Sequence, residues 1–241
     1  MRILTYNVHR CVGTDGRLDV GRVAAVIAAE APDVVALQEV DVGRRRTGHV
    51  DQAHEIAKRL GMAFHFNAAL KVEEERYGDA ILTALPEKLI KAGPLPGYRR
   101  IPQLEPRGAI WVAVTEGART LNIINTHLGL VPREQQLQAQ DIAGPGWLGA
   151  APEGPLLLTG DFNATPGTVV YRTLTAGLTD ARRQAKWPVS ATFPSPFPVL
   201  RLDHMFIGKG LRVEAMRVPQ STLAKAASDH LPLVADIVFT D

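Results

Sequence analysis

Short apolar segments rich in β-branched residues recur along the whole chain, and they constrain the fold more than any other feature of the sequence. Several are bounded by Gly, Pro, Asn or Asp, which favours buried β-strands over helices. We therefore predict strands at residues 3–8, 33–40, 80–84, 109–114, 121–126, 156–159, 204–207 and 233–239.

Three further segments have the apolar spacing of amphipathic helices. Residues 20–30 carry apolar side chains on one face, and Asp19 precedes them as a candidate N-cap. Residues 51–60 stop at Gly61, a common signal for a helix C-terminus. Residues 132–142 are rich in Gln and begin with a proline, which suits the first helical turn.

The order of these elements favours an α/β fold with mixed sheets. Several predicted strands follow one another without a helix between them, which argues against a purely parallel, doubly wound sheet. Nothing in the composition marks a linker, and 241 residues suffice for one well-filled core. We therefore expect a single domain over residues 1–241, with the proline-rich segment 188–198 as an ordered surface loop beside a site.

The composition excludes several classes of protein. Hydrophobic residues make up 46% and charged residues 22%, as in globular domains rather than disordered or collagen-like chains. The net charge of +2 gives no preference for nucleic acid or membrane and implies no obligate protein partner. A single cysteine, Cys11, excludes an intrachain disulfide and a thiolate zinc cluster. Without a long apolar run or a signal-peptide pattern, the expected location is cytoplasmic.

Acidic, amide and imidazole side chains gather at the ends of the predicted strands. Each alone has an ordinary structural explanation, such as a turn at Asp-Phe-Asn. Together they indicate a ligand crevice, because strand ends that converge on one edge of a sheet are the usual place for one. They are Asn7, Glu39, His127, Asp161, Asn163, Asp203, His204, Asp229 and His230.

This combination of side chains suits the attack of water on phosphorus. Carboxylate and amide oxygens bind hard cations such as Mg²⁺ or Mn²⁺, whereas zinc would draw more His or Cys ligands. A hard cation polarises a phosphoryl oxygen, a carboxylate takes a proton from water, and an imidazolium stabilises the growing charge. The sequence therefore predicts a metal-dependent phosphoesterase.

Six motifs resemble those of the endonuclease/exonuclease/phosphatase superfamily, in the same order and over essentially the whole chain. The resemblance implies a four-layer α/β/β/α sandwich, in which two mixed sheets pack face to face with helices outside. The motifs are Tyr6-Asn7-Val8, Leu37-Gln38-Glu39-Val40, Asn125-Thr126-His127-Leu128, Gly160-Asp161-Phe162-Asn163, Leu202-Asp203-His204 and Ser228-Asp229-His230-Leu231-Pro232.

The resemblance also implies the ligands of a Mg²⁺ or Mn²⁺ ion. Glu39 matches the principal ligand, and Asn7 would assist through the ion or its waters. Asp229 would contribute from the other side of the metal site.

The catalytic roles follow from the same resemblance. Asp161 would position and deprotonate the attacking water, while Asn163 donates to a phosphate oxygen. His230 would contact the scissile phosphate, oriented by Asp203, and His127 would be a second imidazole facing the phosphate.

The chain departs from parts of the superfamily at three positions. His9 stands where abasic-site endonucleases have an acidic residue, and His127 stands where they lack a histidine. Asp79, in the segment Tyr77-Gly78-Asp79, is acidic where many relatives have an amide. We hypothesise that Asp79 hydrogen-bonds His127 and favours its imidazolium form, the alternative being a solvated turn residue.

Four further features are candidates for contact with the substrate. Arg107, before a predicted strand, is a candidate phosphate clamp or a surface ion pair. Tyr77 and Asp79 are candidate substrate-binding residues, and the run Arg44-Arg45-Arg46 either contacts phosphate or is a solvated loop. The two Phe residues of segment 193–200 form a pocket wall, touch a lipid or cover the end of a sheet.

Three functions are compatible with these features. The first is a phosphodiesterase or phosphatase acting on a small phosphoester or lipid head group. The second is a nuclease, which the low aromatic content of 6% and the near-zero net charge disfavour. The third is a non-catalytic phosphate-binding module, which is disfavoured because every catalytic position of the superfamily is filled.

Overall fold

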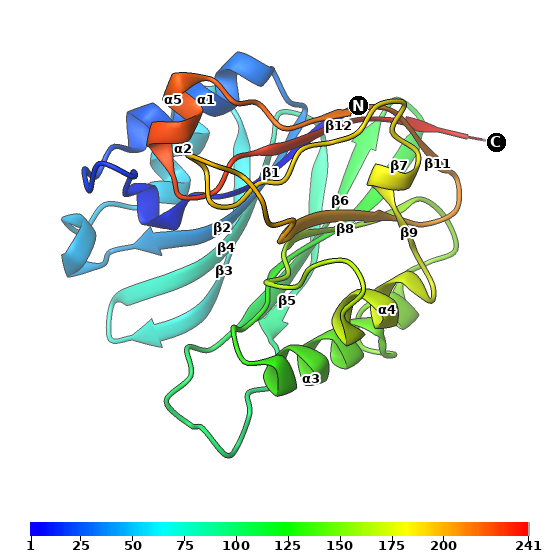
Figure 1. The fold of residues 1–241 in the computed structure, drawn as a ribbon, viewed down its shortest axis with the longest axis horizontal. Coiled ribbons are helices and arrows are strands. Elements are labelled where there is room, and N and C mark those ends of the chain that lie inside the picture. The colour runs from blue at the N-terminus through cyan, green and yellow to red at the C-terminus, as the bar shows by residue number, and fades with distance from the viewer. Residues whose placement is uncertain (241) are drawn as a thin grey trace.

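Two six-stranded sheets pack face to face between outer helices in a computed structural model, which describes residues 1–240 (Figure 1). The strands are β1 (Arg2–Asn7), β2 (Val34–Val42), β3 (Ala63–Val72), β4 (Glu75–Thr83), β5 (Glu87–Pro94), β6 (Gly108–Glu116), β7 (Arg119–His127), β8 (Leu156–Asp161), β9 (Thr179–Asp180), β10 (Asp203–Ile207), β11 (Leu211–Arg217) and β12 (Leu233–Phe239). The α-helices are α1 (Val20–Glu30), α2 (Gln52–Leu60), α3 (Pro132–Ala143), α4 (Val169–Thr175) and α5 (Thr222–Ala227). Short 3-10 helices are η1 (His9–Cys11), η2 (Arg45–Thr47), η3 (Leu148–Ala150) and η4 (Ala181–Arg183).

Each sheet is mixed, as predicted, and has one parallel pair of strands near its centre. The first sheet has the order β11-β12-β1-β2-β4-β3, with β1 and β2 parallel. The second has the order β5-β6-β7-β8-β10-β9, with β7 and β8 parallel. The carboxyl ends of parallel neighbours meet at one edge, so each sheet brings two strand ends together.

Three buried apolar clusters separate the four layers. One joins α1, α2 and α5 to the first sheet, and another joins α3 and α4 to the second. The third lies between the two sheets, where Ile3 and Val34 pack in the same cluster as Ile110 and Leu157. Figure 1 shows the first helix group at the upper left and the second at the bottom. The predicted four-layer α/β/β/α sandwich is confirmed.

The three predicted helices are present, and their ends follow from local capping. The Asp19 side chain accepts a hydrogen bond from the backbone of Arg22, so α1 begins at Val20 as predicted. Asp51 caps α2 in the same way, and Gly61 ends that helix in a left-handed conformation with φ of 67°.

All eight predicted strands are present, and the four that the apolar runs miss are the four edge strands, β3, β5, β9 and β11. An edge strand needs less apolar surface than a central one, so its sequence carries a weaker signal. Strand β5 illustrates this, because most of its residues are exposed or half-buried. Within residues 1–240, no helix combines the length and the apolar character that crossing a membrane requires.

Gly160, the penultimate residue of β8, allows a close approach of two strands. Its φ is +140°, and a Cβ atom built there would lie 1.9 Å from the carbonyl oxygen of Thr126 in β7. We predict that Gly160→Ala lowers the free energy of unfolding by about 2–5 kcal/mol, because both the backbone and β7 must shift. Urea unfolding measures the change.

The matched control is Gly93→Ala in β5, where a Cβ atom meets no other atom within 4 Å. We expect this variant to change stability by no more than roughly 0.5 kcal/mol. Equal unfolding free energies for the two variants would show that the contact with β7 does not constrain residue 160.

Candidate active site

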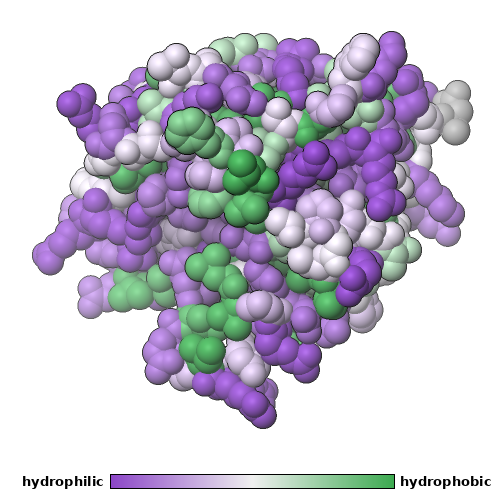
Figure 2. All heavy atoms as spheres, viewed as in Figure 1, coloured by the Kyte–Doolittle hydropathy of each residue, from purple (hydrophilic) through white to green (hydrophobic). Residues whose placement is uncertain are grey.

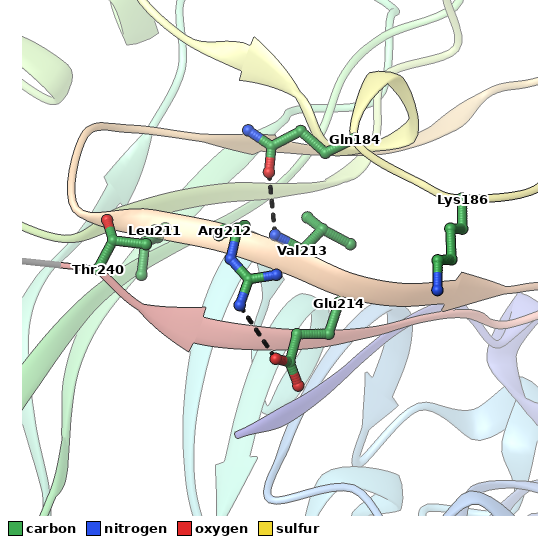
Figure 3. A pocket seen from close by; sticks show the side chains of 7 residues that line it. All are labelled: Gln184, Lys186, Leu211, Arg212, Val213, Glu214 and Thr240. Carbon is green, nitrogen blue, oxygen red and sulfur yellow. Dashed lines mark hydrogen bonds and ion pairs between the residues drawn. The ribbon is translucent and has the colours of Figure 1, made fainter.

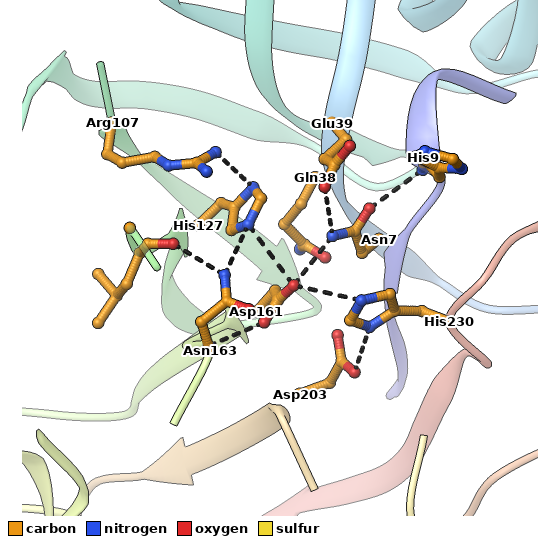
Figure 4. Close-up of polar contacts among 12 residues, drawn as sticks. Asn7, His9, Gln38, Glu39, Arg107, His127, Asp161, Asn163, Asp203 and His230 are labelled. Atoms are coloured by element: carbon orange, nitrogen blue, oxygen red, sulfur yellow. Dashed lines mark hydrogen bonds and ion pairs between the residues drawn. The ribbon is translucent and has the colours of Figure 1, made fainter. Parts of the chain in front are cut away.

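Most of the polar residues predicted from strand ends converge where the two parallel pairs face each other (Figure 4). His204 does not, because its Nε2 lies 2.8 Å from the carbonyl of Ala164 and its ring stacks on that of Phe206. Strands β1 and β2 bring Asn7 and Glu39 from the first sheet. On the second sheet, the strand register pairs His127 with Asp161 and Asp161 with Asp203, so three neighbouring strands present these side chains in a row. The topology thus brings Asn7 and Asp161, which are 154 positions apart in the sequence, into hydrogen-bond contact.

Two buried amide side chains join the sheets directly beneath this cluster. Gln38 of β2 donates to Oδ1 of Asn125 in β7 at 2.7 Å. The amide nitrogen of Asn125 returns hydrogen bonds to the backbone carbonyls of Leu37 and Ala80. Because Glu39 and His127 lie one and two residues beyond the two amides, this connection fixes their relative positions.

Asp161 lies at the centre of the cluster and is almost completely buried. Its Oδ2 accepts a hydrogen bond from Nδ2 of Asn7 at 2.9 Å, and its Oδ1 accepts one from the backbone of Asn163. Nε2 of His127 and Nε2 of His230 lie 3.5 and 3.6 Å from Oδ2. Burial raises the pKa of Asp161 to about 6, although the positive charge of His230 opposes the shift.

His230 is held against Asp203, as the sequence predicts. Nδ1 of His230 lies 2.9 Å from Oδ2 of Asp203, which also accepts a hydrogen bond from Thr192. Burial opposes a charge on the His230 ring, but Asp203 and Asp161 outweigh it and raise the pKa of His230 to about 10. The ring of Phe193 packs 4.8 Å from that of His230, so one of the two Phe residues of the loop supports the site.

Asp161, Asp203 and His230 are near enough to one another to share a metal ion. Their hydrogen bonds argue against that role, because His230 spans the two carboxylates as a cation. A divalent ion there would meet this positive charge. The three groups therefore fit a chain for proton transfer better than a ligand set.

His127 is held in the neutral form. Nη1 of Arg107 lies 3.0 Å from Nδ1 of His127, and a guanidinium can only donate, so Nδ1 accepts and the ring proton lies on Nε2. The Nδ2 group of Asn163, 3.1 Å from Nε2, then forms no hydrogen bond with the ring and donates to the carbonyl of Leu128 instead. Burial lowers the pKa of His127 well below its usual value, and the charges of Arg107 and His230 add to the shift. The ring thus presents an Nε2–H group toward Asp161.

The hypothesis that Asp79 hydrogen-bonds His127 and favours its imidazolium is wrong. The two ring nitrogens of His127 contact Arg107 and Asn163, and the pKa of the ring is lowered, not raised. Asp79 is buried on β4, where burial raises the pKa of its carboxyl well above the usual value. Because burial favours the neutral form of the Asp79 carboxyl, this residue does not supply the negative charge that would stabilise a His127 imidazolium.

The backbone is strained at two residues of the cluster. Glu39 has φ of +59°, and the pairing of β2 with β4 shifts register between Leu37 and Val40, which marks a β-bulge. Asn163 has φ of +47°, and its Nδ2 donates to the carbonyl of Leu128 at 3.0 Å. Strain of this kind concentrates at functional sites, where it fixes the direction of a side chain.

Glu39, Asn7 and Asp229 form a donor set that suits a hard cation. Their side chains offer only carboxylate and amide oxygens. Glu39 and Asp229 are half-buried, and within residues 1–240 neither pairs with a Lys or an Arg. Nδ2 of Asn7 donates to the carboxylates of Glu39 and Asp161, at 3.1 and 2.9 Å, and Oδ1 of Asn7 accepts a hydrogen bond from the backbone of His9. The carboxylate of Glu39 lies beside Asn7, and that of Asp229 lies 3.9 Å from the ring of His9, so both are oxygen donors that suit a Mg²⁺ or Mn²⁺ ion.

The structure places the remaining candidates behind the cluster. Arg107 is buried and contacts His127, Tyr77 and Glu105. Tyr77 is buried and reaches the cluster only through Arg107, with Nη1 of the guanidinium 3.5 Å from its hydroxyl oxygen. Arg107 is thus positioned to orient His127.

The basic run and the second Phe lie outside the cluster. Arg44 pairs with Glu75, and Arg46 forms two hydrogen bonds with the buried carboxylate of Asp41, so two of the three cations are already neutralised. Phe197 is 80% exposed at the surface.

Sequence reasoning missed the residues that support the site. Gln38 and Asn125 lie within quoted motifs, but nothing in the sequence shows that they meet across the sheets. Thr192 donates to Asp203, and nothing in its sequence context marks it. Ser228 donates to the carbonyl of Asn7, and although it lies in the last quoted motif, the sequence does not show this contact. Strand β2 is buried on both faces, so no alternation along its sequence indicates that Gln38 faces the other sheet.

A separate surface hollow of about 660 Å³ shares no residue with this cluster (Figure 3). It lies along β11, where Arg212 and Glu214 pair with each other and Gln184 accepts a hydrogen bond from the backbone of Val213. Its charged groups are satisfied by each other or by solvent, so it offers no comparable chemistry.

The chain matches the Endonuclease/Exonuclease/phosphatase family over residues 4–230. It therefore belongs to that family, as the motifs predict. The protein YbhP of Escherichia coli strain K12 is 26% identical over 249 residues, covering 98% of this chain and 95% of its own length.

Solved structures from other bacteria share the fold. An endonuclease/exonuclease/phosphatase from Beutenbergia cavernae superposes with a TM-score of 0.77 at 25% identity, over 99% of this chain and 71% of its own. The mannosyl-6-phosphatase Bt3783 of Bacteroides thetaiotaomicron superposes with a TM-score of 0.80 at 19% identity, over 99% of this chain and all of its own.

The state of His127 gives a direct prediction. With its pKa lowered by burial and by Arg107, the ring stays neutral, with its proton on Nε2, as the pH falls from 7.5 to 6. Nitrogen-15 NMR of the imidazole measures both protonation and tautomer, with a short histidine peptide as the titrating control. An imidazolium signal near pH 7, or a proton on Nδ1, would contradict the arrangement.

Proposed function

We propose that this protein is a divalent-metal-dependent phosphoester hydrolase that acts on a small substrate. Members of its family are generally hydrolases of phosphoester bonds. The observation that carries the proposal is Asp161, a buried carboxylate between a neutral His127 and a cationic His230, beside the oxygen donors of Glu39 and Asn7.

Asp161 is the general base of this proposal. A base works best when its pKa lies near the working pH, and burial raises that of Asp161 to about 6. Its Oδ1 is held by the backbone of Asn163 and its Oδ2 by the amide of Asn7. Oδ2 also faces both imidazoles, so it is the oxygen that would orient an attacking water and take its proton.

Two imidazoles and an amide face the phosphate in this proposal. His230, a cation held by Asp203, stabilises negative charge that grows on the phosphoryl oxygens. His127 offers Nε2–H as a neutral donor, and the amide of Asn163 lies beside it. A Mg²⁺ or Mn²⁺ ion held by Glu39, Asn7 and Asp229 supplies further polarisation of phosphoryl oxygens when it is bound.

A small substrate is favoured over a nucleic acid by the distribution of charge. Tracking a nucleic acid strand requires a row of free cations. Arg44 and Arg46 are instead bound by Glu75 and Asp41. Arg107, which contacts the cluster, is buried against His127.

The proposal is tested by assaying three substrates side by side: bis-p-nitrophenyl phosphate, p-nitrophenyl phosphate and plasmid DNA. We expect hydrolysis of at least one small ester with Mg²⁺ or Mn²⁺, loss of activity in chelator, recovery on adding the ion, and intact plasmid. Full activity in chelator would refute the metal assignment. Nicking of plasmid at low enzyme concentration would replace the small substrate with a nucleic acid.

The same assay tests the assigned groups. Asp161→Asn and His230→Ala should each lower kcat by about 100-fold or more, because each removes a group that acts only in the reaction. Glu214→Gln on exposed β11 is the control, and circular dichroism checks the fold of all three variants. A near-normal rate in either site variant would exclude that residue from the chemistry.

A further inference from the structure

Helix α3 has three buried polar side chains in its first two turns, and two of them connect the loops around the active site. Gln138 accepts a hydrogen bond from the backbone of Gly129 and donates to the carbonyl of Pro96. Gln135 donates to the carbonyls of Gly129 and Asn163. The hydrogen bonds of both glutamines are therefore explained by the fold.

The third side chain, Glu134, has no such partner. It is 2% exposed, yet within residues 1–240 its carboxylate forms no hydrogen bond and no ion pair. Burial raises the pKa of this carboxyl, an effect that the positive charge of Arg107 partly offsets. A buried carboxylate without a partner destabilises a folded protein, so the fold itself gives no reason for Glu134.

Gly129 makes room for this carboxylate. A Cβ atom built on Gly129 would lie 1.9 Å from Oε2 of Glu134. Gly129 comes two residues after His127, so the space that it leaves holds the carboxylate close to the catalytic cluster. The position of the carboxylate therefore depends on this glycine.

Glu134 lines a cavity of about 440 Å³ between α3 and the loop of residues 95–106. The other walls are mainly apolar and include Leu95, Tyr98 and Ile101, with Arg99 also at the lining. The loop projects beside α3 in Figure 1, and Figure 2 shows apolar side chains gathered over this part of the face. The loop leads directly into Arg107, which contacts His127, so the cavity lies next to the proposed phosphate site.

We propose that this cavity binds the hydroxyl-bearing alcohol part of the substrate, a sugar or other polyol, with Glu134 accepting hydrogen bonds from its hydroxyl groups. The inference rests on the proposed function and names the class of ester. An acceptor-only carboxylate is satisfied by hydroxyl donors, and Tyr98 with the aliphatic walls covers the C–H surface of the same group.

The charges of the cavity favour this class over two others. A second phosphate, as in a nucleic acid, would be repelled by Glu134. An ammonium group would meet Arg99 at the same lining, whereas an uncharged polyol is compatible with both charges. A polyol therefore fits the whole lining.

The test compares Glu134→Gln with the wild type on D-glucose 6-phosphate, glycerol 1-phosphate, phosphoethanolamine and p-nitrophenyl phosphate, all with Mg²⁺ present. We expect the kcat/KM ratio of the polyol esters to p-nitrophenyl phosphate to fall about tenfold or more, mainly through KM. Glu74→Gln, at the exposed turn between β3 and β4, should leave this ratio unchanged. Gly129→Ala should lower it, because the added methyl group displaces Glu134.

If the kcat/KM ratio in Glu134→Gln stays within twofold of the wild-type ratio, the proposal is overturned. A loss of kcat/KM for phosphoethanolamine alone would also overturn it, because this would indicate a cationic ligand. If the wild type hydrolyses no ester, the proposed function fails, and binding then tests the cavity separately. In that experiment glucose 6-phosphate should raise the Tm of the wild type more than that of Glu134→Gln. Equal shifts would contradict the role of Glu134.

Thermal unfolding without ligand gives an independent check. Glu134→Gln should have a Tm equal to or above that of the wild type, because it removes a buried charge that the fold leaves unpaired. A clearly lower Tm would show that the carboxylate stabilises the protein itself, and would overturn the assignment.

Discussion

The hydrogen bond between Gln38 and Asn125 is the constraint on which the site depends. It crosses the apolar interior between the two sheets, where an unpaired amide would be costly, so the sheets stack stably only where the two amides meet. Each amide lies within two residues of a functional strand end, at Glu39 and at His127. One buried polar contact thus sets the stacking of the sheets and the distance across the site.

Above this contact, burial and charge give neighbouring groups opposite protonation states. His127 and His230 both lie within about 4 Å of the same oxygen of Asp161. His127 has a guanidinium at its second nitrogen and is neutral, whereas His230 has the carboxylate of Asp203 there and is cationic. The partner at the far nitrogen therefore decides the role of each ring.

The sequence predicted the central part of the fold and the residues at its strand ends. Apolar runs identified the inner strands, but an edge strand such as β5 lacks the signal because much of it meets solvent. The contact of Asp203 with His230 followed from ordered motifs, while the partner of His127 did not. From the sequence alone, either Arg107 or Asp79 could be the partner of His127. The structure shows that the guanidinium of Arg107, and not the buried carboxyl of Asp79, contacts the imidazole ring.

The sequence did not single out Glu134. This residue is notable because its buried carboxylate has no partner within residues 1–240, and only the complete fold shows this. The sequence also cannot decide between two possible cation sites. One is the buried triad of Asp161, Asp203 and His230, and the other is the more open set of Glu39, Asn7 and Asp229. A cation at the triad would compete with the charge on His230, whereas one at the open donors would neutralise carboxylates that have no Lys or Arg partner within residues 1–240.

The most direct measurement is an anomalous difference map from crystals soaked in Mn²⁺. The account predicts a peak bound to the carboxylate of Glu39, and loss of that peak in Glu39→Gln crystals. A peak between Asp161, Asp203 and His230, or no peak at saturating Mn²⁺, would contradict it.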